Sequence, residues 1–244
     1  MKPLSDCTLY TFIDLAYLHG REVTDIAREL CEGGSDLIQL RAKEWPVERI
    51  EAAAQSILPI LRDYNVGLVI NDHLEIAIEV GADLCHLGQE DFFDSGYTHI
   101  SELQNHPGGG RASPRAVRRQ GARDINPSAT LTASPKLQSS IPQIGLSTHA
   151  PDQARRALSA GAHYVAIGPI FPTGTKPGAR PVTLEYVRWA SANITIPWFA
   201  IGGINLTNLD SVLAAGATRV CVVSAILNSR DIAAECREFR MRMG

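Results

Sequence analysis

The sequence lacks the long apolar runs and the one-sided charge that are typical of membrane and nucleic-acid-binding proteins. No stretch of its 244 residues reaches transmembrane length, and residues 1–8 contain no signal-like apolar run. The formal net charge is only −3, with 23 Lys and Arg against 26 Asp and Glu, which favours neither a nucleic acid nor a membrane surface as a partner. We therefore expect a cytoplasmic protein with no nucleic-acid or membrane partner.

Recognisable redox and metal motifs are also absent. The five cysteines are odd in number, and none belongs to a Cys-x-x-Cys pair. Cys85 and Cys221 fall inside apolar runs, which indicates reduced thiols in the core of a protein from a reducing compartment. His86, His149 and His163 have no partner at metal-ligand spacing, so we interpret them as structural polar residues. The sequence thus offers no redox group, no histidine metal site and no nucleophile–base pair.

What the sequence has is a recurring joint, in which a helical pattern stops at Gly and a short apolar run begins. Gly readily takes the left-handed conformation that commonly ends a helix. The joints begin at Gly33, Gly81, Gly161 and Gly216, and each leads into a strand candidate. Four more apolar runs complete the set, namely Thr8–Ile13, Val66–Ile70, Pro142–Leu146 and Pro197–Ile201.

Eight short strands separated by helical patterns predict a closed (β/α)8 TIM barrel, with residues 1–244 as one domain. The helical patterns include Val47–Arg62, Asp152–Ala160 and Leu206–Ala215. Continuous apolar strands are typical of a parallel sheet that is buried on both faces, and barrels of this kind reach this length as single domains. The active site is then expected at the C-terminal ends of the strands.

The segment 105–140 interrupts this pattern between strands four and five. It is rich in Gly, Pro, Ser, Arg and Gln, a composition that buries little apolar surface. We predict a solvated, flexible insertion; the alternative is a lid, or an arm that reaches another subunit, because long loops in compact domains are often functional. Whether copies of the chain form a homo-oligomer stays open. A local basic cluster lies within the segment, at Arg111, Arg115, Arg118, Arg119 and Arg123.

Three consecutive strand candidates end in loops that suit a phosphate group, which indicates phosphorylated small-molecule substrates. The first loop contains Thr173, Thr175 and Lys176 among Gly and Pro residues. Gly allows close approach of the backbone, hydroxyls donate hydrogen bonds and Lys supplies a compact charge. The other two loops are Gly202-Gly203, ahead of a helix expected from about Asn205, and Ser224-Ala225-Ile226.

The second strand candidate ends with Gln39, Arg41 and Lys43 on one face, because side chains alternate along a strand. In a barrel this face is the interior, where two cations would be costly without an anion. The alternative is a strand that runs out into solvent. Ser147, at the end of the fifth candidate, either donates to a phosphate or caps the next helix.

The third and fourth candidates lead into Asn71-Asp72 and Asp91, which places two carboxylates on adjacent strand ends. Mg²⁺ is typically held by one or two carboxylates plus substrate phosphates, so Asp72 and Asp91 are candidate ligands. The alternatives are a helix cap for Asp72 and a turn role for Asp91.

Seven motifs occur in a fixed order: Gln39-Leu40-Arg41-x-Lys43, Asn71-Asp72, His86-Leu87-Gly88-Gln89-x-Asp91, Gly145-x-Ser147-Thr148-His149, Gly168-Pro169-x-Phe171-Pro172-Thr173-x-Thr175-Lys176, Ala200-Ile201-Gly202-Gly203-Ile204 and Ser224-Ala225-Ile226. The ordered set resembles the thiamine phosphate synthase (thiamine-phosphate pyrophosphorylase) family. The resemblance runs from about residue 9 to the last strand and excludes the Arg-rich segment. Each motif alone is weak, whereas the ordered set is highly specific.

The resemblance implies a transferase that uses Mg²⁺. In such enzymes 4-amino-2-methyl-5-pyrimidinylmethyl diphosphate loses pyrophosphate through a carbocation-like species. The nitrogen of 4-methyl-5-hydroxyethylthiazole phosphate then attacks the methylene carbon, which gives thiamine phosphate. By resemblance, Asp72 and Asp91 bind Mg²⁺, and Arg41, Lys43, Ser147 and Lys176 are the catalytic residues. The same four residues hold the diphosphate together with Asn71, with Gln39 nearby, while the thiazole phosphate is bound by Thr173, Thr175, Gly203, Ser224 and Ile226.

Two alternatives share the barrel and the phosphate loops. One is a thiazole tautomerase-like relative that acts by proton transfer, and such relatives lack the complete acidic pair. The other is a non-catalytic barrel that binds thiazole phosphate or thiamine phosphate, which would not need Asp72, Asp91 and Arg41 together. The joint presence of these three residues favours the synthase.

Overall fold

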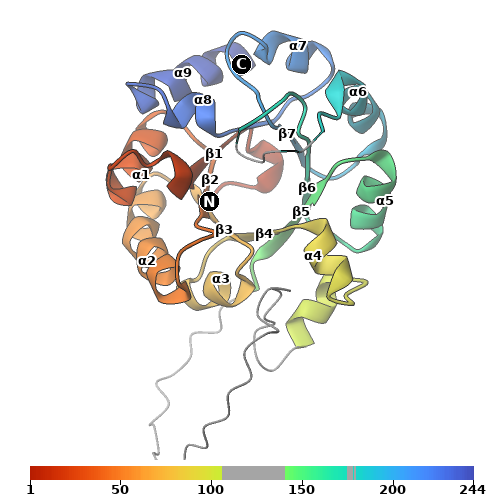
Figure 1. Ribbon diagram of the computed structural model, residues 1–244, viewed down its shortest axis with the longest axis horizontal. Helices are drawn as coiled ribbons and strands as arrows, with labels where there is room; N and C mark the ends of the chain where they lie inside the picture. The colour runs from red at the N-terminus through yellow and green to blue at the C-terminus, as the bar shows by residue number, and fades with distance from the viewer. Residues whose placement is uncertain (106–140, 175–177, 179) are drawn as a thin grey trace, which may run out of the picture.

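The chain folds into a closed barrel of eight parallel strands surrounded by helices, as the sequence predicted (Figure 1). The computed structural model describes residues 1–105, 141–174, 178 and 180–244. Each strand pairs in parallel with the next, and β1 pairs with β8 to close the barrel. The strands are β1 (Leu9–Asp14), β2 (Leu37–Arg41), β3 (Gly67–Asn71), β4 (Leu84–Leu87), β5 (Gln143–Thr148), β6 (Tyr164–Ile167), β7 (Trp198–Ile201) and β8 (Val220–Val222).

The helices form the outer ring and bury their apolar faces against the strands (Figure 1). No helix in the described part of the chain is both long and apolar enough to cross a lipid bilayer. The α-helices are α1 (Val23–Glu32), α2 (Val47–Asp63), α3 (Leu74–Val80), α4 (Gln89–Asp94), α5 (Pro151–Ser159), α6 (Thr183–Asn193), α7 (Leu209–Ala214), α8 (Ser224–Leu227) and α9 (Ile232–Met243), with short 3₁₀ segments η1 (Leu4–Asp6), η2 (Leu15–Tyr17) and η3 (Ile100–Asn105).

The helix after β7 begins later than the sequence predicted. We expected it from about Asn205, but α7 begins at Leu209. The reason is a turn closed by the side chain of Asn208: its Oδ1 accepts from the Asn205 backbone N–H at 2.9 Å, and its Nδ2 donates to the Gly203 carbonyl at 2.9 Å. Asn side chains often compete with helix formation through such local bonds.

The barrel interior beneath the C-terminal ends of the strands is filled by aromatic rings. Tyr10 and Phe199 have ring centroids 5.3 Å apart, and Tyr164 lies 5.8 Å from Phe199. Gly145, which pairs with Tyr164 across β5 and β6, makes room for this layer, because a Cβ at Gly145 would lie 2.0 Å from Tyr164 Cζ. The rings therefore form a packed floor.

The described residues on either side of 106–140 lie at the N-terminal end of the barrel. Before the segment, the Ile100 N–H donates to the carbonyl of Ala160, in the connection that enters β6. After it, the Gln143 N–H donates to the carbonyl of Asp83, the residue that precedes β4. Our expectation of an insertion between β4 and β5 falls on residues outside the described part of the chain, apart from Asn105. The flanks themselves are anchored at the end opposite the C-terminal mouth.

Candidate active site

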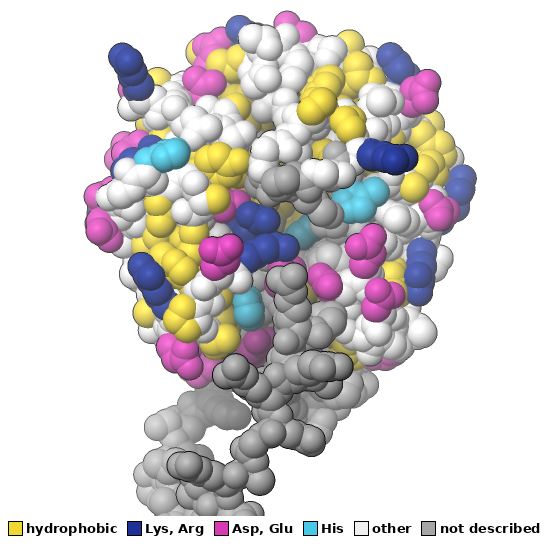
Figure 2. All heavy atoms as spheres, in the orientation of Figure 1, with side chains coloured by type: hydrophobic (Ala, Val, Ile, Leu, Met, Phe, Trp, Pro, Cys, Tyr) yellow, Lys and Arg dark blue, Asp and Glu magenta, His cyan; other side chains and the backbone are white. Residues whose placement is uncertain are grey.

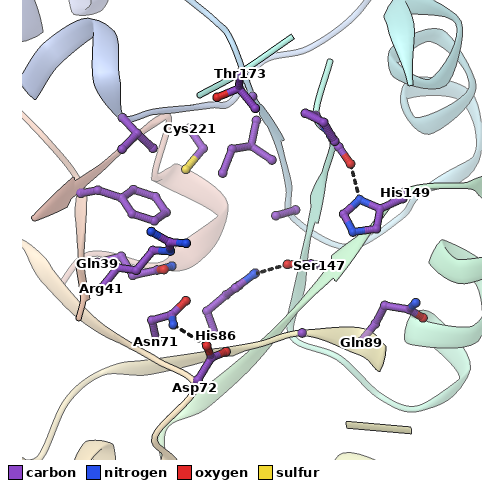
Figure 3. A pocket seen from close by; sticks show the side chains of 18 of the residues that line it. Gln39, Arg41, Asn71, Asp72, His86, Gln89, Ser147, His149, Thr173 and Cys221 are labelled. Atoms are coloured by element: carbon purple, nitrogen blue, oxygen red, sulfur yellow. Dashed lines mark hydrogen bonds between the residues drawn. The ribbon is translucent and has the colours of Figure 1, made fainter. Parts of the chain in front are cut away.

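A cavity of about 210 Å³ opens at the C-terminal ends of the strands. Each strand contributes at least one residue to its wall, and Gln39 and Arg41 of β2 show the period of two expected of barrel interiors. Figure 2 shows Lys and Arg side chains gathered at the centre of this face, with acidic and His side chains around them. The strand residues that line the cavity include Phe12, Gln39, Arg41, Asn71, His86, Ser147, Ala166, Ile201 and Cys221 (Figure 3).

Arg41 is held in place by a carboxylate that the sequence did not single out. Its Nη1 donates to Asp14 Oδ2 at 2.5 Å, and the side chain of Asp14 is only 3% exposed. Asp14 Oδ1 also accepts from the Ala16 backbone N–H at 3.1 Å. Asp14 therefore both caps η2 and neutralises Arg41. The sequence signal that could have identified Asp14 is the alternation of side chains along β1, which places Asp14 on the same side of the strand as Phe12.

The predicted face of β2 does line the cavity. Gln39 is buried, Arg41 is half-buried, and Lys43 follows the strand with its side chain 57% exposed. Lys43 Nζ lies 3.7 Å from Asp72 Oδ2. The alternative of a strand that runs into solvent is wrong for Gln39 and Arg41, because both face the cavity.

The two candidate metal ligands approach the cavity from β3 and α4. Asp72 follows β3 and accepts from Asn71 Nδ2 at 2.7 Å (Figure 3). It does not cap the next helix, since α3 has His73 at its N-cap and no side-chain cap bond. Asp91 was expected at a strand end, but it lies in the first turn of α4, where its carboxylate folds over Gly88. A Cβ at Gly88 would lie 2.6 Å from Asp91 Oδ2.

Electrostatics distinguishes these two carboxylates. Desolvation by burial, with the negative charge of Asp72 next in size, raises the pKa of Asp91 above its ordinary value. The neighbouring Lys43 acts in the opposite direction. A carboxylate whose ionised form is disfavoured by another carboxylate is one that a cation would stabilise.

Ser147 is inside the barrel and is not a helix cap. It lies in β5, whereas the N-cap of α5 is Ala150. Its Oγ is 2.8 Å from Nε2 of His86 (Figure 3). Ser147 thus has a partner within the barrel as well as a place on the cavity wall.

The histidines divide into two groups. His86 and His149 both line the cavity, which our structural interpretation of them missed, because the barrel brings them there from β4 and the β5–α5 connection. His149 Nδ1 contacts the Gly168 carbonyl. His163 lies outside the cavity, and its Nδ1 accepts from the Ile144 N–H at 2.9 Å, as expected of a structural residue. Among the residues described, no three His, Cys, Asp or Glu side chains are arranged so that together they could hold a metal ion.

The phosphate-loop residues that the structure describes converge on the same side of the cavity. Thr173, Gly203 and Ser224 line it and also line an adjoining hollow. Gly203 has a φ of 66°, and a Cβ there would lie 2.5 Å from the Pro172 carbonyl oxygen. Only Gly allows these loops to approach so closely.

The outcome for the other three predicted phosphate-binding residues differs from that of Thr173, Gly203 and Ser224. The side chain of Ile226 is fully buried and lines neither the cavity nor the adjoining hollow, so only its backbone could reach a ligand. Thr175 and Lys176 lie outside the described residues.

Comparison with known proteins assigns the family. The family model described as thiamine monophosphate synthase matches residues 9–97 and 130–226. The chain belongs to this family. A thiamine-phosphate synthase of Thermus thermophilus is 38% identical over 212 residues, covering 86% of this chain and 84% of that protein. One of Methanospirillum hungatei is 34% identical over 235 residues, or 96% of each.

A solved structure agrees with these relatives. The thiamine phosphate pyrophosphorylase of Pyrococcus furiosus superposes with a TM-score of 0.73 at 25% identity, covering 97% of this chain and 95% of that one. As a member of the thiamine monophosphate synthase family, the chain is a transferase of thiamine biosynthesis, which confirms the prediction from its motifs. The tautomerase-like and non-catalytic alternatives are not favoured, because the relatives carry the synthase name.

Proposed function

We propose that the chain joins 4-amino-2-methyl-5-pyrimidinylmethyl diphosphate to 4-methyl-5-hydroxyethylthiazole phosphate, giving thiamine phosphate and pyrophosphate. One observation carries the proposal: a single cavity combines an anchored guanidinium, two carboxylates and Gly-rich phosphate loops. The family and the names of the relatives support the same reaction.

The charge of the cavity supports a divalent cation. Among the described residues that line it, two cations (Arg41, Lys43) face three carboxylates (Asp72, Glu90, Asp91), and Arg41 is already paired with Asp14. A diphosphate would add further negative charge, which the described side chains do not balance. Two carboxylates that leave room for substrate oxygens are the donor set that Mg²⁺ prefers. We therefore assign Mg²⁺ to Asp72 and Asp91.

In the reaction, the bond between the methylene carbon and the diphosphate oxygen breaks, and pyrophosphate leaves with the electron pair. The thiazole nitrogen then forms a bond to that carbon. Arg41, Lys43, Asn71 and Ser147 orient the diphosphate by donating hydrogen bonds to it, with Lys176 added by family resemblance. Bound Mg²⁺ supplies charge neutralisation at the leaving group.

The thiazole phosphate occupies the loops after β6, β7 and β8. Thr173 and Ser224 offer hydroxyls, and Gly203 offers close backbone approach. Thr175 and the backbone of Ile226 join this set by resemblance. In this proposal the two phosphorylated substrates lie on different sides of one cavity.

The test is thiamine phosphate formation from the two purified substrates, with and without Mg²⁺. We expect Mg²⁺-dependent product formation with equimolar pyrophosphate release. Asp91→Asn should lower kcat by orders of magnitude, because the metal contributes several kcal/mol to the transition state. Asp94→Asn is the matched control, since it removes the same charge from the same helix but does not line the cavity. Binding of both substrates without turnover would instead indicate a non-catalytic barrel.

A further inference from the structure

A continuous chain of buried hydrogen bonds runs beneath the cavity from Gln39 to Ser147. Gln39 Nε2 is 2.5 Å from the Tyr10 hydroxyl, which is 3.3 Å from the Tyr164 hydroxyl. The Tyr164 hydroxyl is 3.0 Å from His86 Nδ1, and His86 Nε2 is 2.8 Å from Ser147 Oγ. Figure 3 shows the His86–Ser147 end of this chain, which opens on the cavity. Both of its ends therefore line the site, whereas the tyrosines lie below it.

The hydrogen-bonded network is an integral part of the barrel, because its five residues come from five different strands. Gln39, Tyr10 and Tyr164 are at most 1% exposed, and His86 is 7% exposed. The Tyr164 ring lies over the Cα of Gly145, where any side chain would displace it. Water has little access to these groups, so they form their hydrogen bonds with one another.

The number of protons available on each group determines which group donates in each of these hydrogen bonds. An amide nitrogen only donates, so Gln39 donates to the Tyr10 oxygen, and the single proton of Tyr10 is left for Tyr164. The proton of Tyr164 then goes to His86 Nδ1, which must be the bare nitrogen of a neutral ring. The proton of His86 is consequently on Nε2 and is donated to Ser147 Oγ.

Ser147 is therefore left with a proton that must find an acceptor elsewhere. Its oxygen already accepts from His86, and it lines the cavity. The opposite direction would follow if the Gln39 amide oxygen faced Tyr10. Ser147 would then donate to His86 and could only accept from a ligand, which is unfavourable opposite a diphosphate.

We propose that Tyr10, Tyr164 and His86 are positioning residues that fix Ser147 as a hydrogen-bond donor to the diphosphate of the pyrimidine substrate. Only the identity of the ligand rests on the proposed function. The chain also links Gln39 to Ser147, so one buried network orients two polar groups of the site.

The first test reads the histidine proton directly. In the full chain labelled with ¹⁵N-histidine, long-range ¹H–¹⁵N correlation at neutral pH should show the Nε2–H form of His86, assigned by its loss in His86→Gln. Tyr164→Phe should shift the balance of the two forms towards Nδ1–H, because Nδ1 loses its donor. Tyr186→Phe is the matched control, since that buried hydroxyl bonds Thr148 and the Ala150 carbonyl instead. A wild-type ring protonated on Nδ1 would overturn the proposal without reference to activity.

The second test asks whether the hydrogen-bonded network affects catalysis through Ser147. Ser147→Ala should lower kcat/KM for the pyrimidine diphosphate by roughly ten- to hundredfold, as expected for a bond to a charged group. Tyr164→Phe should lower it by roughly three- to tenfold and leave KM for the thiazole phosphate unchanged, because an unoriented hydroxyl still donates part of the time. The double variant should be no slower than Ser147→Ala.

Additive losses in the double variant would show that Tyr164 acts by another route and would overturn the proposal. Thermal unfolding of each variant controls for loss of fold. A wild-type chain without synthase activity would refute the proposed function, and the tautomer measurement would still decide the direction of the hydrogen bonds.

Discussion

His86 should make the folded chain less stable in mild acid, and replacing it should remove that dependence. The ring is buried between the Tyr164 and Ser147 hydroxyls, and desolvation lowers its pKa from 6.5 to about 4. Asp72 favours the charged form, but by less. As the pH falls, His86 is therefore protonated near pH 6.5 in the unfolded chain, but only near pH 4 in the folded chain.

The sign and size follow from proton linkage. Between those two pH values the unfolded state binds more protons, so the free energy of unfolding falls as the pH falls. The full effect of a shift from 6.5 to about 4 is about 3 kcal/mol, and at pH 5 about 2 kcal/mol of it has been lost. Above pH 6.5 the ring is neutral in both states, and the contribution no longer changes.

The assay is urea unfolding of the wild type and of His86→Gln at about pH 7.5 and about pH 5. The variant loses hydrogen bonds and should be the less stable of the two at about pH 7.5. The gap between them should shrink by about 2 kcal/mol at about pH 5. His163, whose pKa burial also lowers, is present in both proteins and cancels. A gap that stays constant between the two pH values would refute the assignment of His86 as a buried neutral ring.

Three further predictions test other parts of the chain. Asp14→Asn should raise KM for the pyrimidine diphosphate about tenfold, equivalent to about 1.4 kcal/mol, because Arg41 loses the charged partner that orients it; steady-state kinetics in both substrates checks this, and equal effects on both KM values would contradict it. Gly145→Ala should lower the free energy of unfolding by about 1–3 kcal/mol, the usual range for overpacking, because the new methyl group meets the Tyr164 ring; urea denaturation measures it, and a neutral effect would show that the ring can move. Replacing residues 106–139 by a short Gly/Ser linker should barely lower the melting temperature and should keep both KM values within a few-fold, as we propose for a passive insertion whose flanks lie far from the mouth; a salt-sensitive loss of activity in the folded variant would instead favour a lid.

The fold could be predicted from the sequence because its signals are local. Apolar runs mark the strands and Gly joints mark the ends of α1, α3, α5 and α7, and eight parallel strands leave few arrangements other than a barrel. Alternation then predicted that Gln39 and Arg41 face the interior, and both line the cavity. Local signals failed where side chains compete with the backbone, as at Asn208, whose side chain closes a turn that delays the start of α7.

The interior of the site could not be predicted in the same way, because its contacts join residues that are remote in the chain. Asp14 caps η2 through one carboxylate oxygen, but its second oxygen meets Arg41 only once β1 and β2 pair. The contact between Tyr10 and Tyr164 spans 154 positions and that between His86 and Tyr164 spans 78. Neither pair has a spacing that a sequence pattern could reveal. Closure of the barrel turns ordinary buried aromatics and an isolated histidine into one connected network, so the groups that orient Ser147 can be recognised only in three dimensions.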